Sequence, residues 1–165
     1  MKRTLFISFY SILLLFLLGS CTDKNVVDIQ KEKNAVKLVL EKYALANENQ
    51  DLNMIEEIWC PSDSIVSIGT ESGEILQGFS SIKSAVEKQF QAFSKTYISY
   101  SDQLINISKD GNTAWFSEIV NYNFILNEKA MSYEGLRYTG VLVKKDGKWK
   151  LVQTHISVPV MPEPK

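Results

Sequence analysis

The spacing of apolar residues beyond residue 30 first follows the period of an α-helix and later that of a β-strand. The helical face repeats at i, i+3, i+4, i+7 and i+10 and consists of Val36, Val39, Leu40, Tyr43 and Ala46. Asp51 is placed to cap a second, short helix that ends before Pro61. A third helix is expected after Gly78, with Ser80 or Ser81 as its cap.

Beyond Ser94, the alternation of apolar and polar residues predicts four long strands. These strands are rich in Tyr, Ile, Val, Phe and Trp and are expected, after a shorter one at 64–68, at about 96–107, 113–126, 130–145 and 148–158. Asp146-Gly147 suits a two-residue type I′ turn, and Asn127-Glu128 is a weaker candidate for the same turn. Helices followed by an antiparallel meander predict an α+β domain, with three N-terminal helices packed on the sheet.

The N-terminus has the pattern of an export signal. Lys2 and Arg3 precede a mostly apolar run that ends in Leu18-Gly19-Ser20-Cys21. This tetrapeptide resembles the bacterial lipobox, in which the cysteine is acylated and becomes the new N-terminus. We therefore expect residues 1–20 to be a lipoprotein signal peptide, Cys21 to be lipidated, and residues 21–31 to be a tether. The alternative is an uncleaved anchor helix with an incidental cysteine. The expected location is the bacterial cell envelope, with the domain anchored to a membrane and facing the periplasm or the exterior.

Composition excludes several classes of function. Eighteen basic and nineteen acidic residues leave a net charge of -1, which gives no electrostatic reason to expect nucleic-acid binding. One histidine and two cysteines do not form the usual zinc clusters, so we expect no metal. The eight glycines form neither GxGxxG nor GxxxxGK[ST], and no cofactor is expected. Cys60 follows an apolar helix end, which indicates a buried, inert thiol.

Short motifs spread along residues 32–158 resemble the nuclear transport factor 2-like superfamily, in particular its SnoaL-like members. The matching segments are Asp51-Leu52, Trp59-x-x-x-Asp63, Gly78-x-x-x-Ile82, Thr113-Ala114-Trp115, Arg137-x-Thr139-Gly140, Lys145 to Val152 and His155-x-Ser157. The last of these also look like the association domain of calcium/calmodulin-dependent kinase. The resemblance implies a curved antiparallel sheet wrapped around helices to form a cone-shaped cavity. It leaves residues 159–165 as a C-terminal tail, and it does not fix the function, because both enzymes and binding modules share this fold.

The register of the last hairpins predicts which side chains share a face. A two-residue Asp146-Gly147 turn pairs Tyr138 with His155, with Gln153 on the same face. If Asn127-Glu128 is also a two-residue turn, Ser117 joins this face. Glu118 then lies opposite Arg137 on the other face, as a structural ion pair.

The resemblance to the kinase association domain implies that the face with Ser117 and Gly140 lines the cavity. That domain carries arginines at these two positions, so their absence here disfavours an anionic ligand. The expected lining is aromatic with polar tips and consists of Tyr43, Trp59, Trp115, Ser117, Tyr138, Gln153 and His155. Such a lining suits a neutral or weakly polar small molecule. The simpler interpretation is that the three tryptophans are mainly core residues and that His155 is a hydrogen-bonded structural histidine.

Three functions remain open. The first is an envelope lipoprotein that binds a small molecule or a protein, and the second is a small acid–base enzyme of the ketosteroid isomerase, cyclase or dehydratase type. The third is an oligomerising scaffold with a filled cavity. An enzyme would use Asp63 or His155 as its base, but the inferred cavity face holds no acid to complete a pair, which favours binding. The opposite face carries Val141, Val143, Val152 and Ile156, so we expect a homodimer through the sheets.

Overall fold

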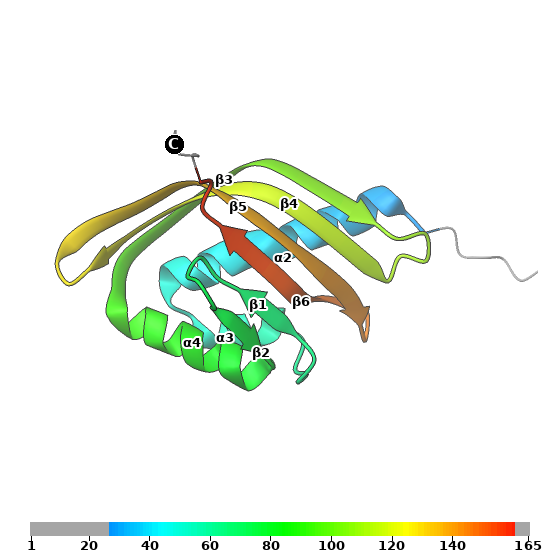
Figure 1. Ribbon diagram of the computed structural model, residues 1–165. Helices are drawn as coiled ribbons and strands as arrows, with labels where there is room; N and C mark the ends of the chain where they lie inside the picture. Colours follow the sequence, from blue (N-terminus) through cyan, green and yellow to red (C-terminus); the bar gives the residue numbers. More distant parts are fainter. Residues whose placement is uncertain (1–26, 161–165) are drawn as a thin grey trace, which may run out of the picture.

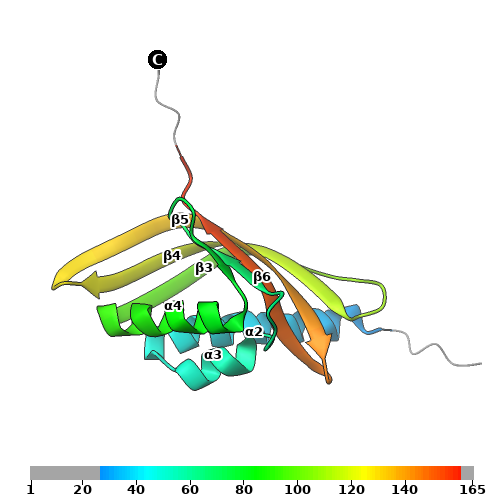
Figure 2. The ribbon, with the colours of Figure 1, turned by 60° about the horizontal axis from the view of Figure 1, so that its bottom comes forward.

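The computed structural model describes residues 27–160, and in this range three helices lie against one side of a six-stranded sheet (Figures 1 and 2). The helices are α2 (Ile29–Asn49), α3 (Leu52–Ile58) and α4 (Phe79–Ala92). The expected signal peptide and Cys21 lie outside the described residues. Because α2 begins at Ile29, the last residues of the expected tether are helical.

The helix N-termini follow simple capping rules. The side chain of Asp28 accepts a hydrogen bond from the backbone N–H of Lys31, and Asp51 caps α3 in the same way, as its position predicted. The prediction of Ser80 or Ser81 as the cap of α4 is wrong, because Gly78 occupies this position and no side chain caps the helix. Gly78 has a φ of 80°, which glycine adopts without steric cost.

The sheet has the order β2-β1-β6-β5-β4-β3 and is antiparallel except where β1 and β6 run parallel. The strands are β1 (Val66–Ile68), β2 (Ile75–Gln77), β3 (Phe93–Ile107), β4 (Thr113–Leu126), β5 (Lys129–Lys145) and β6 (Lys148–Ser157). The four long strands confirm the alternating pattern, whereas β2 was not predicted from the sequence. The sheet curves over the helices, and the β4–β5 hairpin extends beyond them (Figure 2). The architecture is the expected α+β fold.

Both predicted hairpin turns are confirmed. Asp146 and Gly147 have φ values of 50° and 74°, and Asn127 and Glu128 have 49° and 64°. Positive φ at both central positions is the mark of a type I′ turn, whose twist matches that of the flanking strands. The residues that flank each turn pair directly across the hairpin.

A β-bulge in the last hairpin overturns the predicted faces of β6. Leu142 pairs with Leu151, but the next pair is Val141 with Gln153, so Val152 is an extra residue on β6. Tyr138 consequently pairs with Ile156 and not with His155. One extra residue moves every later side chain of the strand to the opposite face.

A second bulge overturns the predicted pair of Glu118 and Arg137. Two residues of β5, one of them Gly135 with a φ of 66°, lie opposite a single residue of β4. As a result, Glu118 pairs with Tyr138, and Ser117 pairs with Thr139. Glu118 therefore belongs to the face that packs toward the helices, where it is buried, and Ser117 belongs to the outer face.

The core lies between the helices and this concave face of the sheet. Its largest fully buried side chains are Trp59, Ile55, Ile65, Ile82, Leu136, Leu142, Leu151 and Val36. Cys60 is also buried, as expected for an inert thiol. Some of the core residues, among them Leu40, Ile82 and Val86, also line a cavity under the sheet.

Candidate functional site

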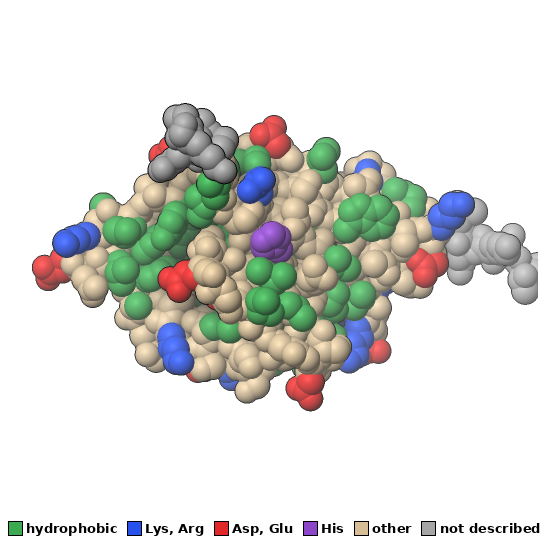
Figure 3. Space-filling model, in the orientation of Figure 1, with side chains coloured by type: hydrophobic (Ala, Val, Ile, Leu, Met, Phe, Trp, Pro, Cys, Tyr) green, Lys and Arg blue, Asp and Glu red, His purple; other side chains and the backbone are tan. Residues whose placement is uncertain are grey.

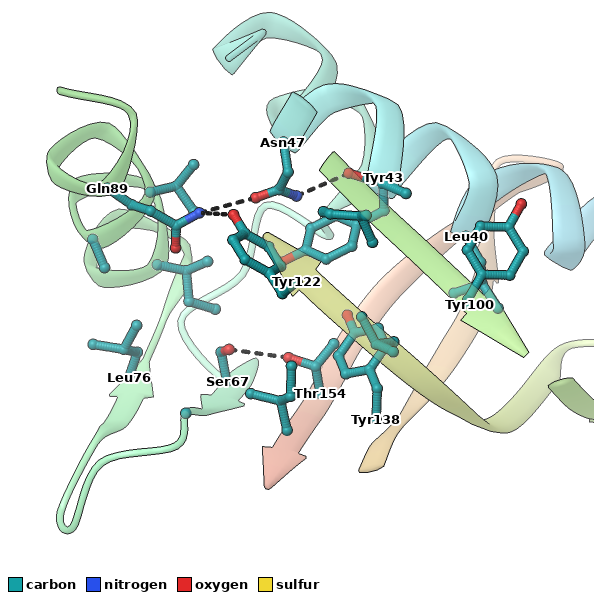
Figure 4. A pocket seen from close by; sticks show the side chains of 18 of the residues that line it. Leu40, Tyr43, Asn47, Ser67, Leu76, Gln89, Tyr100, Tyr122, Tyr138 and Thr154 are labelled. Carbon is teal, nitrogen blue, oxygen red and sulfur yellow. Dashed lines mark hydrogen bonds between the residues drawn. The ribbon is translucent and has the colours of Figure 1, made fainter. Parts of the chain in front are cut away.

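A cavity of about 340 Å3 lies between α2, α4 and the concave face of the sheet (Figure 4). Apolar side chains such as Leu40, Leu76, Val86 and Ile156 form much of its wall. Its polar lining consists of Tyr43, Asn47, Ser67, Glu74, Gln89, Tyr100, Glu118, Tyr122, Tyr138 and Thr154. An apolar cavity with a few convergent polar groups is the usual form of a small-molecule site.

One part of the polar lining is held by an amide network. Gln89 Nε2 on α4 donates to Asn47 Oδ1 at 3.2 Å and to the hydroxyl oxygen of Tyr122 at 2.8 Å (Figure 4). Asn47 Nδ2 in turn donates to the backbone oxygen of Tyr43. The network links α2, α4 and β4, so it fixes this wall of the cavity before any ligand enters.

The hydroxyl group of Tyr138 has no such partner. Tyr138 is only 7% exposed, and its hydroxyl forms no hydrogen bond of good geometry with any residue between 27 and 160, although Tyr43 and Thr154 lie close enough to influence its pKa. Its ring stacks on Tyr43 at a centroid distance of 6.1 Å and meets Phe116 edge-on at 5.1 Å. Burial raises the pKa of the Tyr138 phenol well above its ordinary value, so the group stays protonated and can donate.

Glu118 lies beside Tyr138 on the neighbouring strand and is also only 7% exposed. Its Oε2 accepts a hydrogen bond of 2.7 Å from Gln103 Nε2. Burial raises the pKa of the Glu118 carboxyl, and the hydrogen bond from Gln103 partly offsets that effect. Within the described chain, no lysine, arginine or histidine lines the cavity to balance this carboxyl group.

The structure brings only two of the predicted pocket residues, Tyr43 and Tyr138, to the cavity wall. Trp59 packs edge-on against Tyr43 at 6.4 Å but is 0% exposed and belongs to the core. The two candidate bases, Asp63 and His155, are exposed and do not line the cavity. The single histidine is visible at the surface in Figure 3.

Three further predicted residues, Trp115, Ser117 and Gln153, pair across the strands with residues of the outer face and do not line the cavity. Sequence reasoning missed the polar residues that take their place, above all Glu118. A glycine inside a predicted strand is a known sign of a bulge, and Gly135 could have indicated the shift that turns Glu118 inward. No comparable signal marks the bulge at Val152.

Two other kinds of site were searched for in the described range. Between residues 27 and 160, no three His, Cys, Asp or Glu side chains gather closely enough to hold a metal ion. None of the helices in this range is both long and apolar enough to cross a membrane.

Comparison with known proteins gives a family and a fold. The model of the SnoaL-like domain matches residues 36–161. No curated protein matches the chain. Among solved structures, a nuclear transport factor 2-like superfamily protein from Salmonella enterica has a TM-score of 0.73 at 17% identity, over 81% of this chain and 95% of that one.

Two further similar structures carry the names of enzymes. A protein of Streptomyces avermitilis, named for a dehydratase of the NTF2-like family, has a TM-score of 0.68 at 17% identity, over 80% of this chain and 99% of its own. A protein of Novosphingobium aromaticivorans, named for a scytalone dehydratase, has a TM-score of 0.70 at 14% identity. The match covers 79% of this chain and 86% of that one. At these identities the likeness is one of fold.

Proposed function

The chain belongs to the SnoaL-like domain family, and from that premise we propose that its cavity binds a small, largely apolar molecule. The observation that carries this proposal is the hydroxyl group of Tyr138, which is buried in the cavity wall without a hydrogen-bond partner. A buried polar group without a partner costs about 1–3 kcal/mol. A ligand that bonds this hydroxyl recovers that free energy and, by filling the cavity, removes apolar surface from water.

The proposal includes a location for the domain. The segment that ends in Cys21 supports a lipoprotein signal, so the domain would be held by acyl chains on a membrane of the bacterial envelope. In that setting the cavity faces the periplasm or the exterior and takes up its ligand there. A scaffold role would need a filled cavity, and the volume of about 340 Å3 argues against it.

The binding function is tested with a neutral hydrophobic dye, N-phenyl-1-naphthylamine, added to the purified full chain. We expect its fluorescence to rise on binding. Ala85→Phe places a ring in the cavity and should abolish the signal, because Ala85 is part of the lining. Ala92→Phe is the matched control, since Ala92 is exposed at the end of the same helix. Equal signals from the two variants would place the dye elsewhere and refute the proposal.

A second function, acid–base catalysis, is favoured by one observation. Glu118 and Tyr138 are cross-strand neighbours that both line the cavity, which supplies the pair of proton-transfer groups that such an enzyme needs. The role of base would then belong to Glu118, because Asp63 and His155 lie outside the cavity. Nuclear magnetic resonance can follow exchange of the α-protons of β-tetralone in heavy water. Exchange catalysed by the wild type but not by Glu118→Gln would establish this function, and equal rates would exclude it for this substrate class.

A further inference from the structure

The charged side chains that line the cavity in the described part of the chain are all acidic. Of the ionisable side chains in its lining, Glu118 and Glu74 are acids, and among the described residues no basic side chain joins them. Two further acids, Glu41 and Glu48 on α2, lie near the cavity without lining it. Burial raises the pKa of the Tyr100 phenol, and the nearby carboxylates of Glu41, Glu118 and Glu48 add to that effect. Lys37 Nζ lies 3.7 Å from Glu41 Oε1, and this ion pair is near the surface.

Glu118 is the most confined of these acids and lacks a cationic partner. Its carboxyl group is buried, and the amide of Gln103 is its one hydrogen-bond donor among residues 27–160. A buried carboxylate without a positive partner is strongly disfavoured, so Glu118 requires either a proton or a cation close by. Burial raises the pKa of Glu118, which reflects the same cost of burying its charge.

The remaining wall suits a cation as well. Tyr43, Tyr100, Tyr122 and Tyr138 all line the cavity, and the rings of Tyr43 and Tyr138 stack beside one another. The face of an aromatic ring attracts a positive charge, most strongly where water is excluded. The free hydroxyl oxygen of Tyr138 can also accept a hydrogen bond from an N–H group.

We propose that the ligand of this cavity is an organic amine, bound as its ammonium ion with Glu118 as the counter-ion. The apolar body of the amine fills the space between α2, α4 and the sheet, and its N–H groups reach Glu118 and Tyr138. This inference rests on the proposed binding function and adds the charge class of the ligand. It replaces the neutral ligand expected from the sequence, because that expectation assigned Glu118 to the outer face.

The test compares probes of one shape and different charge. Calorimetric titration of the purified full chain at pH 7.5 would use phenethylamine, 2-phenylethanol and phenylacetate. We expect the amine to bind at least about tenfold more tightly than the alcohol, and the carboxylate to bind more weakly than either. Glu118→Gln keeps the shape of the side chain and removes its charge. It should weaken amine binding by about tenfold or more and change alcohol binding by less than about threefold.

Glu128→Gln is the matched control, because it removes the same charge at an exposed turn far from the lining. Its affinity for the amine should equal that of the wild type. Equal binding of amine and alcohol by the wild type overturns the inference, and this comparison needs no variant. If neither probe binds while the neutral dye still does, the inference also fails and the binding function stands. If the dye fails as well, the binding function itself is refuted.

Discussion

Gln103 Nε2 donates a hydrogen bond of 2.7 Å to Glu118 Oε2 across the β3–β4 pair, and a β-bulge makes this contact possible. The register of β3 shifts between Ser101 and Leu104, so Asp102 and Gln103 both lie opposite Glu118. Asp102 takes a φ of 52° and is exposed. In an uninterrupted strand Asp102 would face Glu118 and bring two carboxyl groups together. The extra residue places an amide donor there instead.

This relationship predicts the effect of Gln103→Ala. The variant leaves the buried carboxyl group of Glu118 without its donor, so we expect a loss of about 1–3 kcal/mol in the free energy of unfolding at neutral pH. Urea denaturation followed by circular dichroism measures the loss. Asp102→Asn is the control, since asparagine also tolerates positive φ, and should stay within about 0.5 kcal/mol of the wild type. A loss shared by both variants would mean that the bulge matters and the hydrogen bond does not.

Two tyrosine-to-phenylalanine substitutions should change the stability of the protein in opposite directions. Tyr138→Phe removes a buried hydroxyl that has no partner, so the empty protein should gain about 1 kcal/mol of stability. Tyr122→Phe removes an acceptor used by Gln89 at 2.8 Å and should cost about 0.5–1.5 kcal/mol. Thermal unfolding without added ligand distinguishes the two. A destabilised Tyr138→Phe variant would show that the hydroxyl group is already satisfied.

The buried carboxyl group of Glu118 predicts a pH-dependent stability. Burial raises its pKa in the folded protein above the ordinary 4.5, so between these values the folded chain holds more protons than the unfolded chain. Stability contributed by this group therefore falls as the pH rises through that window. Glu118→Gln does not titrate, so its melting temperature should exceed that of the wild type by more at pH 7.5 than at pH 4. The exposed substitution Glu128→Gln should show no such difference, and a difference independent of pH for Glu118→Gln would contradict the account.

The sequence predicted those parts of the fold that depend on local patterns. Helical spacing, the cap at Asp51 and the two type I′ turns each depend on a few neighbouring residues, and all were confirmed. The backbone torsions of a turn depend mainly on the turn residues themselves. The turn at Asp146-Gly147 can therefore be predicted without knowledge of the rest of the chain.

Which residues line the cavity could not be predicted from local patterns in the sequence. The register shifts once in the β4–β5 pair, near Gly135, once in the β5–β6 pair, at Val152, and twice in the β3–β4 pair, of which one shift is at Asp102. A bulge depends on how two strands pair and not on the alternation within one strand, and a shift of one residue exchanges the two faces of the strand. For this reason Glu118 was expected outside and His155 inside, whereas the structure has the reverse.

The outer face of the sheet still predicts a homodimer. Trp115 and Leu104, which are 48% and 65% exposed, lie on this face together with Val141, although Ile156 belongs to the cavity and no longer supports the argument. Exposed apolar side chains on one face favour contact with a second copy. We expect light scattering at tens of micromolar to give the mass of a dimer.

A charged side chain introduced on the outer face of the sheet should dissociate the predicted dimer. Trp115→Glu is predicted to give a monomer, because a buried carboxylate without a partner disfavours the interface. Leu38→Glu is the control, since Leu38 is just as exposed as Leu104 but lies on α2. A monomeric wild type would refute the prediction, and so would a dimer that persists in Trp115→Glu.

Lipidation at Cys21 is the prediction that decides where the cavity works. Metabolic labelling with a palmitate analogue in a bacterial host should give a labelled, membrane-associated protein, and Cys21→Ala should abolish both properties. Cys60→Ala is the matched control, because it removes the other cysteine of the chain, which is buried in the core and not available to an acyl donor. An uncleaved anchor helix would leave Cys21→Ala on the membrane and keep Met1 at the N-terminus. Equal labelling of wild type and Cys21→Ala would exclude a lipoprotein and move the ligand search away from the envelope.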